Sequence, residues 1–83
     1  GPQASHADLA VAGQRVAIAW KEFDGEQTRL HALLSSDGGM TFEPRELGVT
    51  AGASDHARVI TKGDVLYTFW HTQNEGFRLY QLP

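Results

Sequence analysis

Cysteine is absent from this 83-residue chain, so neither disulfide bonds nor a thiolate-ligated zinc site can hold it together. A chain of this length buries only about 60–65% of its unfolded surface, which leaves room for a thin hydrophobic core. Basic residues are also few, since seven Lys and Arg against ten Asp and Glu give a net charge of −3. A nucleic-acid partner is therefore not expected, because binding the phosphate backbone needs clustered positive charge.

Long apolar runs are missing as well. No stretch approaches the ~18 consecutive apolar residues that a membrane-spanning helix needs, and no signal peptide is recognised, so we expect no membrane partner. Gly1 and Pro2 resemble the residues that a protease leaves after removing an affinity tag. Residues 1–4 are accordingly assigned to a tag remnant and leader. The sequence leaves the native compartment open, with a secreted or periplasmic parent protein as the expectation.

An internal repeat with a period near 50 organises the rest of the chain. When the chain is aligned with itself at an offset of 50, four identities appear: His6/His56, Ala7/Ala57, Gly13/Gly63 and Trp20/Trp70. Deleting one residue in the next loop extends the match through Arg29/Arg78, Leu30/Leu79 and Leu33/Leu82. A period of this size is typical of β-propellers, in which each repeat folds as a four-stranded sheet called a blade.

Seven strands are predicted from the period-two alternation of apolar residues and from the turn residues between them. They cover residues 9–12, 16–21, 30–35, 41–47, 57–61, 65–71 and 77–82. The predicted fold class is all-β, with antiparallel four-stranded propeller blades. Residues 5–48 form one complete blade, and residues 49–83 form three strands of a second. Trp20 and Trp70 are expected to pack between blades, where their large area stabilises most.

Residues 35–42, Ser-Ser-Asp-Gly-Gly-Met-Thr-Phe, fit the Asp-box pattern Ser-x-Asp-x-Gly-x-Thr-Trp with phenylalanine in the last place. In such a turn an aspartate accepts hydrogen bonds from backbone N–H groups, glycines permit positive φ, and the aromatic ring anchors the hairpin. A calcium site is the weaker alternative, because one carboxylate falls short of the several oxygen ligands that calcium takes. We therefore predict a structural Asp-box and no metal site, with the motif residues Ser35, Asp37, Gly39, Thr41 and Phe42.

With this motif between the third and fourth strands of a 50-residue repeat, the chain resembles the sialidase-like (BNR/Asp-box repeat) β-propeller family from His6 to Leu82. The resemblance implies a ring of six blades, with structural Asp-boxes on the face opposite the active site. Exo-α-sialidases of this family use three arginines, a tyrosine nucleophile assisted by a glutamate, and an aspartic acid. No catalytic residue is assigned here, and the isolated chain is not expected to be an enzyme, because no family arginine motif surrounds Arg15, Arg29, Arg45 or Arg58.

The resemblance also implies which loops gather on the functional face. These loops carry His6, Asp8, Lys21, Glu22, Asp55, His56, Arg58 and His71. His6 and His56 begin equivalent inner strands, and two interpretations stay open for them. They line a pocket or bind a metal such as Zn, Cu or Ni with copies in other blades, or they hold the adjacent loop by hydrogen bonds. The second interpretation is favoured, so no cofactor is assigned.

A unit of two blades leaves its outer faces and one strand edge uncovered, and both are association sites. Three copies would supply six blades, so a homotrimer is expected, with a strand-exchanged dimer or an open aggregate as alternatives. Two functions remain. The first is a non-catalytic structural module that self-assembles or binds. The second is a part of a glycan-binding protein or exo-sialidase-type glycoside hydrolase that needs further blades to act on a carbohydrate ligand.

Overall fold

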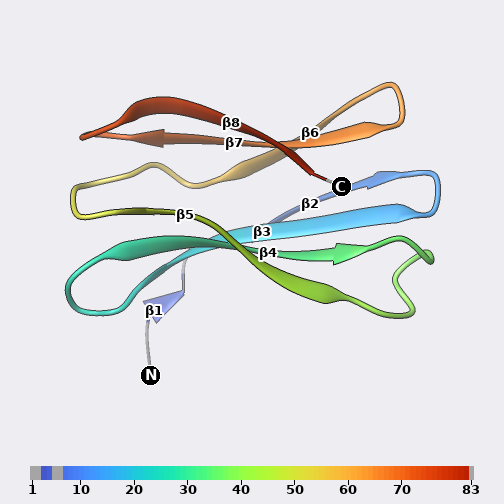
Figure 1. Ribbon diagram of the computed structural model, residues 1–83, viewed down its shortest axis with the longest axis horizontal. Helices are drawn as coiled ribbons and strands as arrows, with labels where there is room; N and C mark the ends of the chain where they lie inside the picture. Colours follow the sequence, from blue (N-terminus) through green and yellow to red (C-terminus); the bar gives the residue numbers. More distant parts are fainter. Residues whose placement is uncertain (1–2, 5–6, 83) are drawn as a thin grey trace.

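The computed structural model describes residues 3–4 and 7–82, which form eight strands and no helix (Figure 1). The strands are β1 (Gln3–Ala4), β2 (Asp8–Ala12), β3 (Arg15–Phe23), β4 (Thr28–Ser35), β5 (Glu43–Thr50), β6 (Arg58–Lys62), β7 (Val65–Thr72) and β8 (Gly76–Leu82). The predicted all-β class is confirmed. Within these described ranges no helix could span a membrane.

Two antiparallel sheets contain all of these strands. In the first sheet β3 pairs with β4 and β4 with β5, while β1 and β2 follow each other along the remaining edge of β3. The first sheet therefore holds five strands in four positions. The second sheet contains β6, β7 and β8 in that order. The described part of the chain forms these two sheets and no closed ring, so the propeller remains a prediction.

The 50-residue repeat of the sequence is also a repeat of the structure. β6 follows β2 by 50 residues at both ends, and β7 begins 50 residues after β3. Gly13 and Gly63 close the two equivalent hairpins with nearly equal φ values of 63° and 64°. A residue with a Cβ atom is strained at such φ values, so glycine at both positions favours the same turn in each repeat.

The fourth strand of the first sheet is placed differently from the prediction. It was predicted over residues 41–47 but begins at Glu43, because the N–H and hydroxyl groups of Thr41 donate to Asp37 and hold Thr41 in the turn. It continues to Thr50, since residues 48–50 pair with residues 28–30. A β-bulge between Leu30 and His31 shifts the register there and interrupts the alternation on which the prediction relied.

The N-terminal end differs as well. Residues 3–4 were assigned to the leader, yet they form β1 and pair with Glu22 and Phe23 at the end of β3. This two-residue pairing has no alternation that sequence reasoning could detect. β1 extends the edge that β2 occupies, so the first sheet keeps its width of four positions.

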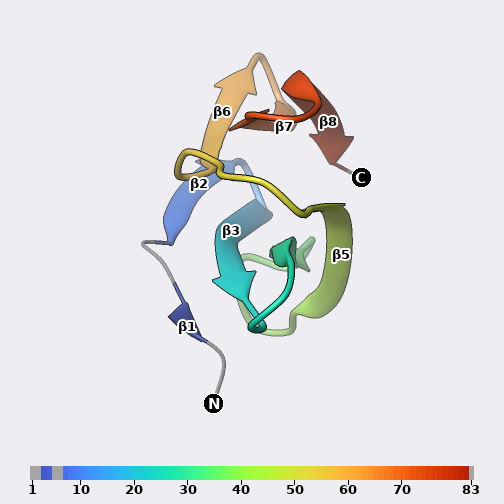
Figure 2. The ribbon, with the colours of Figure 1, turned by 90° about the vertical axis from the view of Figure 1, so that its left-hand side faces the viewer.

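The two sheets stack face to face, and the hydrophobic core lies between them (Figures 1 and 2). The first sheet contributes Ala17, Ala19, Leu30, Ala32 and Leu34, and the second contributes Val59, Leu66, Trp70 and Leu82, with Ala57 just before it. The closest approaches between the sheets join β2 to β6 and β7, and β3 to β6. The distance between the two sheets therefore increases toward β5 and β8, and the pair of sheets is wedge-shaped.

Polar contacts join the two sheets at both ends of the core. The Arg15 guanidinium donates to the carbonyl oxygens of Asp64 (2.9 Å) and Leu82 (2.7 Å), so one side chain holds the β6–β7 turn and the end of β8. At the other end, the Asp8 carboxylate accepts a hydrogen bond of 2.7 Å from the backbone N–H of Val59. These contacts fix the second sheet relative to the first.

Candidate functional site

Asp37 lies at the centre of the turn between β4 and β5. Its carboxylate accepts hydrogen bonds from the Ser35 hydroxyl (2.7 Å), from the N–H groups of Met40 (3.1 Å) and Thr41 (3.0 Å), and from the Thr41 hydroxyl. These donors hold the pKa of Asp37 well below its usual range, the Thr41 hydroxyl contributing most. The carboxylate is therefore committed to its own turn.

The other residues of the predicted Asp-box complete this turn. The Gly39 N–H donates to the Ser35 hydroxyl at 2.9 Å, and Gly38 and Gly39 have φ values of 75° and 95°. The Phe42 ring lies beside Gly39 and is 38% exposed. The turn shares one end of the sheets with the β2–β3 and β6–β7 turns, whereas the loops predicted to bind a ligand lie at the other end (Figure 1).

A shallow hollow between the starts of β2 and β6 brings together three of the predicted ligand residues, Asp8, His56 and Arg58. Asp8 already has a structural task, because its carboxylate accepts the N–H of Val59 in the neighbouring sheet. His6, the predicted counterpart of His56, lies outside the described residues. The hollow lies where β2 and β6 approach each other, the position nearest the axis if the sheets belong to a ring.

Three further predicted residues meet at the β5–β6 loop. His71 Nδ1 lies 3.3 Å from the carboxylate of Asp55, and the Trp70 indole N–H donates to the Asp55 carbonyl oxygen at 3.1 Å. The Lys21 ammonium group donates to the carbonyl oxygen of Ser54 and contacts its hydroxyl at 3.4 Å. Lys21 belongs to the first sheet and His71 to the second, so these contacts tie the loop to both sheets.

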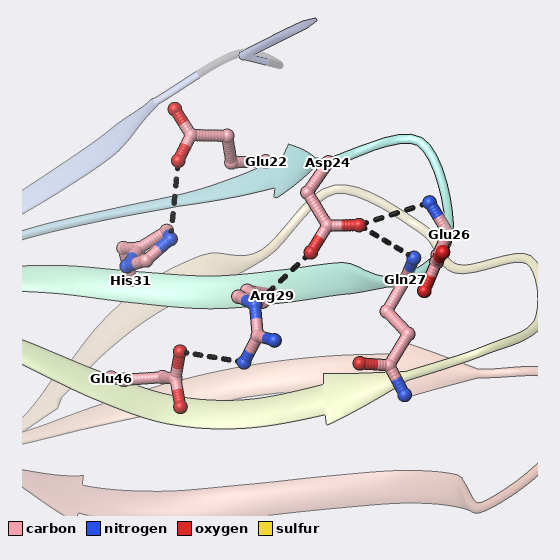
Figure 3. Close-up of polar contacts among 7 residues, drawn as sticks. All are labelled: Glu22, Asp24, Glu26, Gln27, Arg29, His31 and Glu46. Atoms are coloured by element: carbon pink, nitrogen blue, oxygen red, sulfur yellow. Dashed lines mark hydrogen bonds and ion pairs between the residues drawn. The ribbon is translucent and has the colours of Figure 1, made fainter. Parts of the chain in front are cut away.

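Glu22 is separate from the other predicted residues. Its carboxylate lies 3.3 Å from His31 Nε2 (Figure 3). Both side chains lie on the face of the first sheet that points away from the second sheet. The His31 ring in turn stacks on Trp20, with a centroid distance of 5.6 Å and an interplanar angle of 27°. Sequence reasoning assigned His31 no role. Seven of the eight predicted ligand residues thus divide among three places instead of forming one site, and the eighth, His6, lies outside the described residues.

A polar network involving Asp24, Arg29 and Glu46 lies beside this pair (Figure 3). Arg29 Nε lies 3.3 Å from Asp24 and Arg29 Nη1 lies 3.1 Å from Glu46. Asp24 also accepts the N–H groups of Gln27 (2.8 Å) and Glu26 (2.9 Å), and these two bonds chiefly lower its pKa. The described residues contain no cluster of three or more His, Asp or Glu that could hold a metal ion. The contacts of Asp24 and Arg29 therefore hold the β3–β4 loop in place.

Large apolar surfaces distinguish the outer faces of the two sheets. The outer face of the first sheet consists of Leu9, Val11, Val16, Ile18, Trp20 and Leu33. The outer face of the second sheet consists of Ile60, Tyr67, Phe69, Phe77 and Leu79. Leu9 is 56% exposed, Leu79 59% and Phe77 71%, so apolar area is open to solvent on both sides of the wedge. Contiguous apolar surfaces of this kind mark interaction sites.

The outer face of the first sheet corresponds to the face of the second sheet that is buried between the sheets. At the offset of 50 the pairs are Val16/Leu66, Ile18/Thr68 and Trp20/Trp70. Leu66, Thr68 and Trp70 are at most 1% exposed, because they pack against the first sheet. Trp70 packs between the two sheets, as expected, whereas the expectation for Trp20 stays a prediction, since no sheet of the described residues lies on that side.

The two repeats differ in side-chain size on their other face. Ala17 and Ala19 on the first sheet face the core and let the second sheet approach closely. Their counterparts on the outer face of the second sheet are Tyr67 and Phe69. Large aromatic side chains therefore replace small ones on the face that has no neighbour in the chain, which increases the apolar area offered there.

Comparisons of this chain with protein-family models, with curated proteins and with solved structures find no match. The resemblance to sialidase-like propellers accordingly stays a prediction from the repeat and the motif. The features of the chain that bear on function are the internal repeat and the two outer faces.

Proposed function

We propose that this chain is a non-catalytic structural module of the sialidase-like propeller type that associates with copies of itself. The outer face of the second sheet in one chain stacks on the outer face of the first sheet in the next. One observation carries the proposal: Trp20 and its surroundings are equivalent to Trp70 and its surroundings, which the same chain buries against a neighbouring sheet.

The contact between chains is head-to-tail, because the two outer faces are of different kinds. In the repeat, the outer face of the first sheet matches the face of the second sheet that packs against the first sheet. The outer face of the second sheet matches the face of the first sheet that packs against the second sheet. Stacking one on the other repeats the internal arrangement, and such heterologous contacts form a ring if the rotation closes.

The wedge shape of the sheet pair favours closure over an open filament. The sheets lie closest at β2 and β6, so successive wedges curve around an axis beside these strands. Three chains with two sheets each would provide the six sheets that the resemblance implies. A homotrimer is therefore the favoured assembly, and it would cover the apolar faces that a monomer exposes.

Light scattering over a concentration series tests the assembly. The expected mass is about three times the 9.1 kDa of the chain and is constant over the series at high concentration. A monomer at all concentrations contradicts the proposal. A mass that keeps rising with concentration contradicts closure of the ring.

Two single-face variants test the head-to-tail geometry. Leu9→Lys places a charge on the outer face of the first sheet, and Leu79→Lys places one on the outer face of the second. Each variant alone is expected to be monomeric, because every contact would bury one lysine. An equimolar mixture retains one intact pair of faces and is expected to form a heterodimer of about twice 9.1 kDa.

Met40→Lys is the matched control, since Met40 is 85% exposed in the Asp-box turn and belongs to neither outer face. It is expected to assemble like the parent chain. A mixture of the two face variants that stays monomeric would point to a symmetric contact between like faces. Hydrolysis of a fluorogenic sialoside by the purified chain would contradict the non-catalytic assignment.

A further inference from the structure

Side chains of the first sheet bond across the gap to the second sheet. Asp8, Arg15 and Lys21 each reach a backbone group of the second sheet or of the loop that precedes it. At the offset of 50, their counterparts in the second sheet are Arg58, Val65 and His71. The pairing in β6 and β7 puts these counterparts on the outer face of the second sheet, the face that the proposed function stacks on the next copy.

The three counterparts differ in chemistry from the residues whose places they take. Val65 has no polar side-chain group. His71 is shorter than lysine, and its Nδ1 already lies 3.3 Å from the carboxylate of Asp55 in the same chain. Arg58 is the clearest change, because a guanidinium only donates hydrogen bonds, whereas the carboxylate of Asp8 accepts one. The three polar contacts within the chain are therefore not repeated between copies.

The N–H group that receives the Asp8 carboxylate has an equivalent in the first sheet. Val59 pairs with Thr68 in the register in which Leu9 pairs with Ile18, each residue 50 positions later. The N–H of Val59 points away from β7, so the N–H of Leu9 points away from β3, toward the edge of β2 that pairs with no described strand. In the stacked arrangement this N–H faces Arg58 of the neighbouring copy.

We propose that Arg58 is the residue that keeps the contact between copies reversible, an inference that rests on the proposed function. Arg58 places a hydrogen-bond donor opposite the N–H of Leu9, which is also a donor. Neither group gains a bond there when two copies stack, and covering an unpaired donor opposes association. The apolar faces drive the stacking, and the donor at position 58 weakens it, so trimer and monomer exchange.

Arg58→Asp tests this role by supplying the acceptor that Asp8 supplies within the chain. The new carboxylate is expected to accept the N–H of Leu9 in the next copy. The concentration of half-association in light scattering is then expected to fall at least about tenfold. Lys62→Asp is the matched control, because it makes the same change of charge on the same strand and face, and its counterpart Ala12 has no polar side-chain group. Its midpoint is expected within about threefold of the parent chain.

An uncharged pair of variants covers the case in which a second carboxylate in the hollow of Asp8 unfolds the chain. Arg58→Asn supplies an acceptor without a charge, and Lys62→Asn is its control. The midpoint is expected to fall for Arg58→Asn and to stay near that of the parent chain for Lys62→Asn. Equal midpoints for these two variants overturn the proposal.

Amide hydrogen exchange locates the new bond. In assembled Arg58→Asp, the Leu9 amide is expected to exchange at least about tenfold more slowly than in the assembled parent chain. The Val11 amide lies two residues further along the same edge of β2 and is expected to exchange at the same rate in both assemblies. A lower midpoint without slower exchange at Leu9 overturns the pairing of position 58 with this N–H.

The two proposals fail in different ways. A trimeric parent chain with equal midpoints for Arg58→Asp and Lys62→Asp leaves the stacking standing and overturns the role of Arg58. A trimer of Arg58→Asp beside a monomeric parent chain supports the role of Arg58 and contradicts assembly of the parent chain. If the parent chain and Arg58→Asp are both monomeric at every concentration, both proposals are overturned.

Discussion

Trp20 and Trp70 occupy equivalent positions in consecutive sheets, and only Trp70 is covered. Trp70 is fully buried, with its indole N–H bonded to the Asp55 carbonyl oxygen, whereas Trp20 is partly exposed and stacks on His31. The side chains are the same, and the strands that carry them, β3 and β7, are equivalent in the repeat. The difference arises from the neighbouring sheet, which exists on one side of the second sheet and not on the outer side of the first.

The two tryptophans should consequently differ in their effect on stability. Trp70→Ala is expected to lower the free energy of unfolding by about 3–5 kcal/mol, because a large cavity would open in a thin core. Trp20→Ala should cost clearly less in a dilute monomer and should reduce self-association at high concentration. Urea denaturation and light scattering measure the two effects.

A milder substitution keeps the test usable if Trp70→Ala does not fold. Trp70→Phe removes less volume and is expected to cost about 1–3 kcal/mol. Equal losses for Trp70→Phe and Trp20→Phe in dilute monomers would contradict the asymmetric burial of these two side chains.

Gly48 leaves room for side chains of the second sheet that reach across to β5. A Cβ atom at this position would lie 2.5 Å from the Tyr80 hydroxyl oxygen and 3.4 Å from the Trp70 ring. Gly48→Ala is therefore expected to destabilise the chain by about 1–3 kcal/mol in urea denaturation. Adding Tyr80→Phe removes the hydroxyl group and should restore part of the loss. If Gly48→Ala and the double variant are equally destabilised, the contact with the Tyr80 hydroxyl is not the cause.

Arg15 joins the sheets through two hydrogen bonds, to the carbonyl oxygens of Asp64 and Leu82. Arg15→Ala is expected to lower the free energy of unfolding by roughly 1–3 kcal/mol, because both bonds have a charged donor. Arg15→Lys keeps the charge but cannot reach both oxygens, so part of the loss should remain. Arg45→Ala is the control, since Arg45 is exposed and its ion pair with Glu43 is long; a loss of at most about 0.5 kcal/mol is expected.

Protonation of Asp37 should make the stability of the fold depend on pH. Its pKa is lowered in the folded chain by the Thr41 hydroxyl and other donors, so the ionised carboxylate stabilises the fold. That contribution is fully present above the unfolded pKa of about 3.9 and is lost as the pH falls through the lower folded-state pKa. Melting temperatures between pH 7 and pH 2 should therefore fall less steeply for Asp37→Asn than for the parent chain.

Other carboxylates also contribute to the acid dependence of stability. The pKa values of Asp24 and Glu75 are also lowered, so Asp37→Asn should keep a residual dependence on pH. Identical slopes for the parent chain and Asp37→Asn would show that the Asp-box carboxylate does not contribute.

Local sequence predicted the strands because each signal for them is local. Alternating apolar residues located β3 and β7, and Gly13 and Gly63 located the hairpin turns that precede them. The same reasoning misplaced β5, because the bulge at Leu30 and the hydrogen bonds of Thr41 interrupt the alternation. It also missed β1, which is too short to carry a pattern.

The candidate ligand residues were harder to place from sequence. Glu22 and Lys21 are adjacent in β3, so their side chains point to opposite faces, and only the sheet neighbours decide what each one meets. Lys21 meets Ser54 in the loop between the sheets, whereas Glu22 meets His31 on the outer face. The contact of Lys21 joins residues 33 positions apart, and that of Glu22 depends on the register between β3 and β4; a single sequence contains no direct signal for either.

The sequence by itself determined the all-β class, the repeat and the turn positions, since backbone preferences and side-chain alternation act over a few residues. Only the tertiary structure decided which face of each sheet is covered. Both faces of β3 and of β7 carry apolar side chains, so the alternation does not show which face meets a neighbouring sheet. Burial depends on the neighbouring sheet, and packing against it covers Trp70 and leaves Trp20 open.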